Sequence, residues 1–88
     1  MTDTLDRLRA RVTELDTQLL ATVNARLDVV RELVAHKRET GAPMLDPARE
    51  QWLLDHLSAA NTGPLSAAGV DRLFRFVLQL TKEESFVG

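Results

Sequence analysis

An uninterrupted helical pattern at the start of the chain constrains its fold more than any other feature. Between Thr4 and Arg38 there is no Gly and no Pro. Apolar residues recur there every three or four positions, which is the spacing of one helix face. They are Leu5, Leu8, Val12, Leu15, Leu19, Val23, Val30, Leu33 and Val34. The pattern predicts a single helix of about 50 Å, which residues 40–43 (Thr-Gly-Ala-Pro) end.

Two shorter helices are predicted to follow. Asp46 is placed to cap the second helix and Pro47 to occupy its first position, and the pattern continues to about Ala60. Residues 61–64 (Asn-Thr-Gly-Pro) interrupt it, and Ser66 can cap a third helix. Because no strand pattern competes, the sequence predicts an all-α subunit of three helices, the first of them long.

The proportions of these helices predict association. Helices of about 14 and 20 residues cannot cover the apolar stripe of a helix of about 50 Å within one subunit. A second copy of the chain, related by twofold symmetry, covers such a stripe most simply. The 88 residues form one domain, residues 1–88, near the size at which a single core barely suffices. We therefore expect a homodimer.

Composition and charge exclude several classes of protein. The formal net charge is −2, with 11 basic and 13 acidic residues, whereas nucleic-acid modules carry a basic excess. The chain has no Cys, so disulfides and thiolate chemistry are excluded. Neither a signal-like segment nor an apolar run of membrane-spanning length is present. We expect a cytoplasmic protein that binds neither nucleic acid nor a membrane.

The histidines and large aromatic residues are expected to have structural roles. His36 and His56 lie on different predicted helices, and two His residues without Cys or a carboxylate cluster make a poor metal site. Solvent-facing or capping positions are expected for them. Trp52 and Phe74 lie on apolar stripes, which predicts core positions. No metal and no cofactor is expected.

One cation interrupts the apolar seam of the long helix. If Leu5 is heptad position a, then Val12, Leu19, Arg26 and Leu33 continue the same row. Arg26 there is costly unless an anion meets its guanidinium. A purely structural interpretation is also open, in which the aliphatic stem packs and the charged group reaches water, or the residue sets the register.

Further cations favour a ligand site over a structural role for Arg26. Lys37 follows eleven residues later, so the two side chains leave nearly the same side of the helix, about 16 Å apart. The turn that follows returns the chain toward this end and carries Asp46, Arg49 and Glu50. Arg9 lies about 25 Å from Arg26 along the helix. In an antiparallel dimer it can reach the other subunit's site instead. These residues predict a small, multiply negative ligand.

Motifs along nearly the whole chain resemble the AroQ-type, all-helical chorismate mutases. The matching segments are Leu8-Arg9, Leu15-Asp16, Leu19-Leu20, Ala25-Arg26, His36-Lys37, Asp46-Pro47-Ala48-Arg49-Glu50 and Arg72-Leu73-Phe74. The resemblance implies an intertwined homodimer with two sites, each built from both chains, and the rearrangement of chorismate to prephenate. It implies that Arg9 of the partner and Arg26 bind the two carboxylates. Lys37 would donate to the breaking ether oxygen.

The resemblance also implies roles for the remaining site residues. Arg49 would contact a carboxylate or support the residues that do, and Thr81 would lie near a carboxylate. Glu50 and the backbone of Asp46 would receive the ring hydroxyl. Ser85 stands where the family has Gln or Glu, the second donor to the ether oxygen, and its side chain is about two bonds shorter. The rearrangement is pericyclic and needs no nucleophile, metal or proton transfer, so oriented cations can supply both positioning and charge stabilisation.

Other functions remain open at this point. The Ser85 substitution keeps 4-amino-4-deoxychorismate as an alternative substrate, and isochorismate, cleaved by lyases of the same fold, as another. A non-catalytic helical dimer that binds an anion is a second class, and a plain coiled-coil dimeriser is a third. Some small mutases of this kind gain activity with a partner synthase, so such a partner is also kept.

Overall fold

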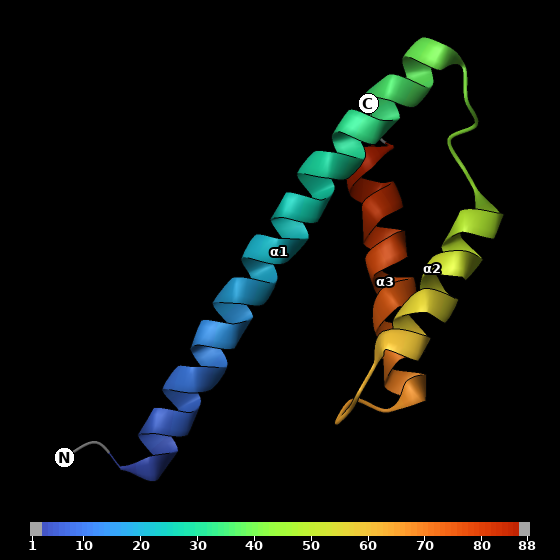
Figure 1. The fold of residues 1–88 in the computed structure, drawn as a ribbon. Helices are drawn as coiled ribbons and strands as arrows, with labels where there is room; N and C mark the ends of the chain where they lie inside the picture. Colours follow the sequence, from blue (N-terminus) through green and yellow to red (C-terminus); the bar gives the residue numbers. More distant parts are fainter. Residues whose placement is uncertain (1–2, 87–88) are drawn as a thin grey trace.

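Three α-helices make up the fold in the computed structural model, which describes residues 3–86 (Figure 1). They are α1 (Thr4–Thr40), α2 (Pro47–Ala60) and α3 (Ala67–Ser85). Residues 3–86 contain no strand. The prediction of an all-α, three-helix subunit with one long N-terminal helix is therefore confirmed.

At the start of each helix, one side chain accepts a hydrogen bond from one of the free N–H groups of the first turn. The bonds run from the N–H of Asp6 to Asp3 (2.8 Å), from that of Arg49 to Asp46 (3.0 Å) and from that of Gly69 to Ser66 (3.0 Å). Pro47 occupies the first turn of α2, where its missing N–H costs nothing. Local sequence chemistry thus sets all three starting points.

Gly41 ends α1 within residues 40–43, where the sequence predicted the helix to stop. It adopts φ = 75°, a left-handed conformation that costs other residues free energy, and its N–H bonds to the carbonyl of Lys37. The N–H of Ala42 bonds to the same carbonyl at 3.1 Å. This turn reverses the chain immediately after Lys37 and directs the loop toward α2.

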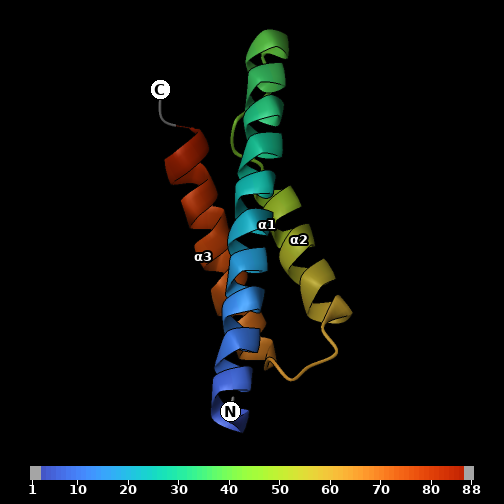
Figure 2. The same cartoon turned by 90° about the vertical axis from the view of Figure 1, so that its left-hand side faces the viewer.

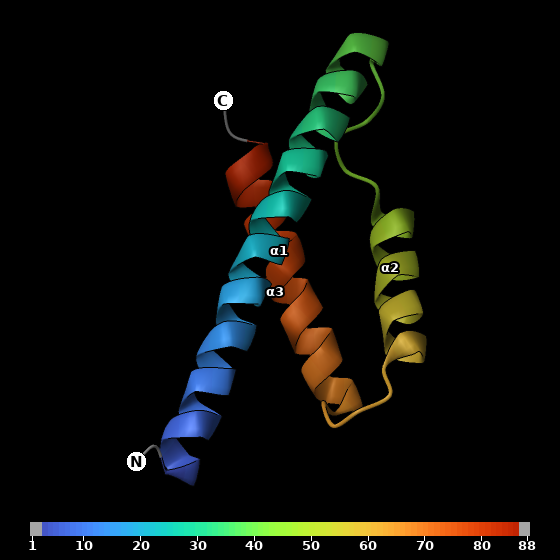
Figure 3. The ribbon, with the colours of Figure 1, turned by 60° about the vertical axis from the view of Figure 1, so that its left-hand side comes forward.

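Helix α3 packs against both α1 and α2. Figure 1 shows it between the C-terminal half of α1 and helix α2, and Figure 3 shows it crossing α1 at an angle. In Figure 2, α2 and α3 lie on opposite sides of α1. One apolar residue of each helix is buried: Val34 of α1, Leu54 of α2 and Val70 of α3. The core of the subunit is small.

The N-terminal half of α1 has nothing packed against it in the subunit (Figure 1). Every residue from 3 to 22 is exposed, and Leu8 and Leu15 remain 60% and 47% exposed. The radius of gyration is 16.8 Å, against about 12 Å for a compact domain of this length. The accessible surface is 7010 Å², against about 5,200 Å² for a folded monomer of this size. The predicted shortage of cover for the long helix is confirmed.

Within residues 3–86, no helix is both long and apolar enough to cross a membrane.

Replacing Gly41 with Ala should lower the free energy of unfolding by about 1 kcal/mol, because a Cβ disfavours the left-handed conformation. Nothing lies within 4 Å of the position that this Cβ would take, so the loss is one of backbone conformation and not of packing. Gly41→Asn is the matched variant and should lose less, since Asn tolerates this conformation. Urea unfolding followed by circular dichroism measures both, and equal losses would contradict the assignment.

Candidate anion-binding site

A cavity of about 150 Å³ lies where the three helices meet, and we call it the central cavity. Six of the eight predicted site residues line it: Arg26, Lys37, Asp46, Arg49, Glu50 and Thr81. Apolar side chains complete the wall, among them Val30, Val34, Leu53, Leu78 and Phe86. Three cations and two carboxylates thus share one partly apolar space. Cations and an anionic ligand interact more strongly there than in bulk water.

Arg26 is half-buried and bonds to a neutral partner. Its guanidinium donates to the hydroxyl of Thr81, which donates to the carbonyl of Val77 at 2.7 Å. Burial lowers the pKa of the Arg26 guanidinium below its ordinary value. No carboxylate within residues 3–86 forms an ion pair with it. A half-buried cation with no counter-charge in the subunit is the arrangement that a bound anion would complete.

The turn after α1 positions the Lys37 ammonium. Its Nζ donates to the carbonyl of Met44 at 3.2 Å, and Met44 also lines the central cavity. An ammonium has three donors, so two remain for a ligand. Because Met44 belongs to the loop that Gly41 begins, the geometry of this turn and the position of the Lys37 charge are linked.

Arg49 is held between the start of α2 and an aromatic ring. Its backbone N–H donates a hydrogen bond to the Asp46 carboxylate, and its guanidinium carbon lies 4.2 Å from the centroid of the Trp52 ring. The ring of His56 stacks on Trp52 at 4.8 Å with planes 8° apart. Trp52 is 50% exposed, so the prediction that it belongs to the core is wrong. Spacings of three and four residues put these side chains on one helix face, where the cation–π contact restrains Arg49.

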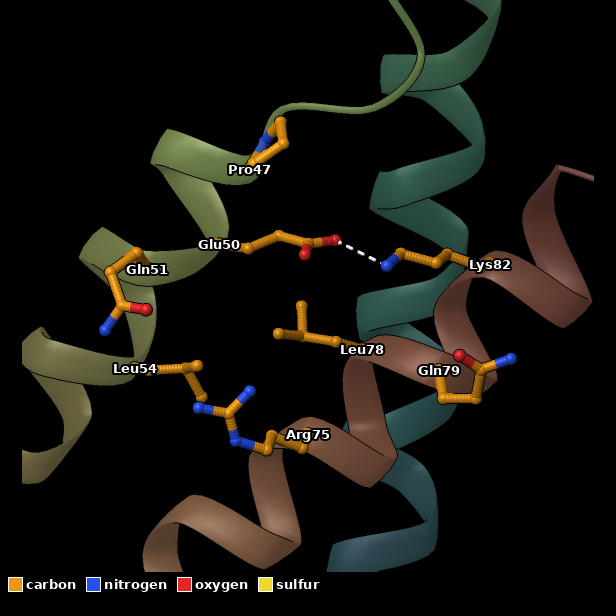
Figure 4. A pocket seen from close by; sticks show the side chains of 8 residues that line it. All are labelled: Pro47, Glu50, Gln51, Leu54, Arg75, Leu78, Gln79 and Lys82. Carbon is orange, nitrogen blue, oxygen red and sulfur yellow. Dashed lines mark ion pairs between the residues drawn. The ribbon is translucent and has the colours of Figure 1, made fainter.

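Glu50 forms an ion pair with Lys82, a residue that the sequence did not single out. Its carboxylate accepts from the ammonium of Lys82 on α3 at 3.0 Å, and about one third of each side chain is exposed. Figure 4 shows the two reaching toward each other across a second cleft between α2 and α3. This cleft, the outer groove, has a volume of about 320 Å³ and also contains Leu54, Arg75 and Leu78. Glu50 and Leu78 line both the groove and the central cavity.

Two predicted site residues do not join the others within the subunit. Arg9 is exposed on the first half of α1, about 25 Å along the helix from Arg26. Ser85 is only 7% exposed, and its hydroxyl has no hydrogen-bond partner in the described part of the chain. It lies one turn after Thr81 and is absent from the cavity wall. The ligand-binding roles of all eight residues stay predictions.

The apolar residues that line the central cavity could have been predicted from helix periodicity. Val30 and Val34 follow Arg26 by four and eight residues, and Leu78 precedes Thr81 by three. Each therefore lies on the same helix face as a predicted site residue. The pairing of Lys82 with Glu50 could not be predicted in this way, because it depends on how α2 and α3 are placed relative to each other.

The fold and the cavity define a class of protein: an all-helical subunit with a partly apolar cavity lined by three cations. Residues 8–85 match the family model of chorismate mutase type II. The chain belongs to this family.

Two curated relatives are both named bifunctional chorismate mutase/prephenate dehydratase. The protein from Pseudomonas aeruginosa is 36% identical over 81 residues, and that from Stutzerimonas stutzeri is 32% identical over 81 residues. Each alignment covers 86% of this chain and 22% of the relative. The chain therefore spans about a fifth of the length of these relatives.

Replacing Arg26 with Leu should raise the free energy of unfolding of the ligand-free protein by about 1 kcal/mol, because an apolar side chain replaces a half-buried cation without a counter-charge. The hydroxyl of Thr81 keeps its bond to the Val77 carbonyl, so no buried donor is orphaned.

Arg38→Leu is the matched control, since Arg38 is an exposed cation in the last turn of the same helix. It should give no gain, because a cation there interacts favourably with the helix dipole. Denaturant unfolding measures both variants. A clear loss of stability in Arg26→Leu would contradict the view that the guanidinium lacks a charged partner.

Proposed function

We propose that the protein is a chorismate mutase, an isomerase that rearranges chorismate to prephenate. The observation that carries the proposal is the set of three cations, Arg26, Lys37 and Arg49, around one partly apolar cavity. Chorismate is a flexible dianion with two carboxylates and one ring hydroxyl. Membership of the chorismate mutase type II family and the printed names of the relatives support this substrate.

The reaction needs a folded substrate and a stabilised oxygen more than a reactive side chain. The ether C–O bond breaks while a C–C bond forms within the same molecule, and no proton is transferred. Arg26 has a planar fork of donors that suits a carboxylate and helps to hold the reactive conformer. Negative charge develops on the ether oxygen as its bond breaks. The Lys37 ammonium, tethered to the Met44 carbonyl, stabilises that charge more in the transition state than in the ground state.

Glu50 is the side chain best suited to the ring hydroxyl. The hydroxyl is the one strong hydrogen-bond donor of the dianion, and a carboxylate oxygen is an acceptor. The Asp46 carboxylate already accepts from the N–H of Arg49, and the Thr81 hydroxyl accepts from Arg26. Glu50 keeps free lone pairs beside its contact with Lys82.

Ser85 has a smaller role in the proposal than its position in the resemblance implies. Its hydroxyl is buried one turn from Thr81 and does not line the central cavity. We therefore assign the contact with the ether oxygen to Lys37 and leave Ser85 as a supporting residue of the cavity wall.

The proposed active enzyme is a homodimer in which the partner's α1 completes each site. The excess surface of the subunit, about 1,800 Å² over a compact monomer, exceeds the roughly 800 Å² that each partner buries in a standard interface. The central cavity, at about 150 Å³, is below the usual range of about 300–1,000 Å³ for ligand sites. Arg9, remote from its own subunit's cavity, is the cation that a partner helix would supply. Docking of this dimer onto a separate synthase is also proposed.

Incubating the purified protein with chorismate should yield prephenate, and Lys37→Met should lower kcat by about 10²–10³ with a smaller effect on KM. The substitution keeps the length of the side chain and removes the charge that stabilises the ether oxygen. Arg38→Met is the matched control, since Arg38 is the exposed neighbour and should retain wild-type turnover. A folded wild-type protein that produces no prephenate would refute the proposed function.

Mixing two inactive variants tests the shared site. Arg9→Ala and Lys37→Met should each be nearly inactive, and random subunit exchange should restore about a quarter of wild-type activity, because each heterodimer regains one complete site. Arg26→Ala mixed with Lys37→Met should restore none, because both defects fall in the part of the site that one subunit supplies. Full activity of Arg9→Ala alone would contradict the shared site.

A further inference from the structure

We infer that Lys82 is a specificity-determining residue: by pairing with Glu50 it adapts the site to a neutral ring hydroxyl and disfavours a ring ammonium. The inference rests on the proposed function and names a preference between two related substrates. Chorismate carries the hydroxyl, and 4-amino-4-deoxychorismate carries an amine, protonated near neutral pH, at the same ring position.

The ion pair between Glu50 and Lys82 differs from the others in the structure. Within residues 3–86 it is the one ion pair that joins two helices, whereas Arg11–Glu14 and Arg75–Asp71 lie within single turns of one helix. Its 3.0 Å contact is half-buried, while the side chains of the other two pairs are 49–64% exposed. Figure 4 shows it closing the cleft between α2 and α3 above Leu78.

Lys82 acts on the central cavity from outside it. Its side chain lines the outer groove and is absent from the wall of the central cavity, whereas Glu50 lines both. A ligand in the central cavity therefore meets the carboxylate of Glu50, with the ammonium of Lys82 behind it. Lys82 is in this sense a positioning residue, since it reaches the ligand through Glu50.

The charges around the cavity show what this pair changes. Arg26, Lys37 and Arg49 can balance two carboxylates, and the Asp46 carboxylate caps α2. Because Lys82 balances Glu50, a hydroxyl can donate to Glu50 without adding a charge. A ring ammonium at the same place would add a positive charge next to Lys82. Without Lys82, the free Glu50 carboxylate would instead attract that ammonium.

The expected size of the preference is about tenfold in the ratio of kcat/KM for the two substrates. Two positive charges a few ångströms apart in a partly buried site repel each other strongly enough for this. The one-third exposure of both side chains keeps the effect below that of a fully buried pair.

The test compares both substrates on the intact wild-type protein and three variants. Lys82→Met removes the charge, and the ratio of kcat/KM for the amine over the hydroxyl substrate should rise about tenfold. Lys82→Arg keeps the pair and should keep the wild-type ratio. Arg75→Met is the control, because Arg75 lines the outer groove but pairs with Asp71 and not with Glu50. It should also leave the ratio unchanged.

The possible results separate this inference from the function on which it rests. A ratio that rises in Lys82→Met alone supports the inference, and a purely structural role would lower both rates together without changing their ratio. Wild-type turnover of chorismate with an unchanged ratio in Lys82→Met overturns the inference and leaves the mutase intact. Absence of turnover in the folded wild-type protein overturns both. Circular dichroism of each variant confirms that it is folded.

Discussion

The structure depends on the placement of one cation, Arg26, in the apolar seam of a long helix. The guanidinium bonds to the buried Thr81 hydroxyl and borders an open cavity, and burial lowers its pKa. Without a counter-charge in the subunit, the free energy of this arrangement favours a bound anion. In the proposed function, the bound dianion would supply the negative charge that Arg26 lacks within the subunit.

The same arrangement explains why the subunit is so open. Among residues 3–86, three buried apolar residues make a small core, and the first half of α1 is exposed. A helix that is exposed on all sides is marginal in water unless another element buries its apolar face. Association and ligand binding are therefore coupled in the proposed dimer. The interface that would bury the stripe is also the one that would bring Arg9 to the cavity.

Local features of the sequence predicted the helices well, because they depend on neighbours in the chain. Asp46, Pro47, Ser66 and Gly41 act through their own backbone and that of the next turn. Arg26 and Lys37 could be assigned to one helix face for the same reason. The pair of Glu50 and Lys82 could not be predicted, since it depends on the placement of α2 against α3. The prediction of a core position for Trp52 was wrong, since its ring contacts Arg49 and His56 on the same face of α2.

The proposed pericyclic reaction would place few demands on the side-chain chemistry of the site. With no nucleophile or general base required, the balance and position of charges around the cavity would determine both rate and specificity. In the proposed site, a charge behind the wall, such as that of Lys82, would change which ligand the cavity prefers without contacting the ligand. Glu50 lines both the central cavity and the outer groove. A change at Lys82 in the outer groove would therefore alter the electrostatics of the central cavity. Substrate preference in such a site would then depend on side chains that do not contact the substrate as well as on those that do.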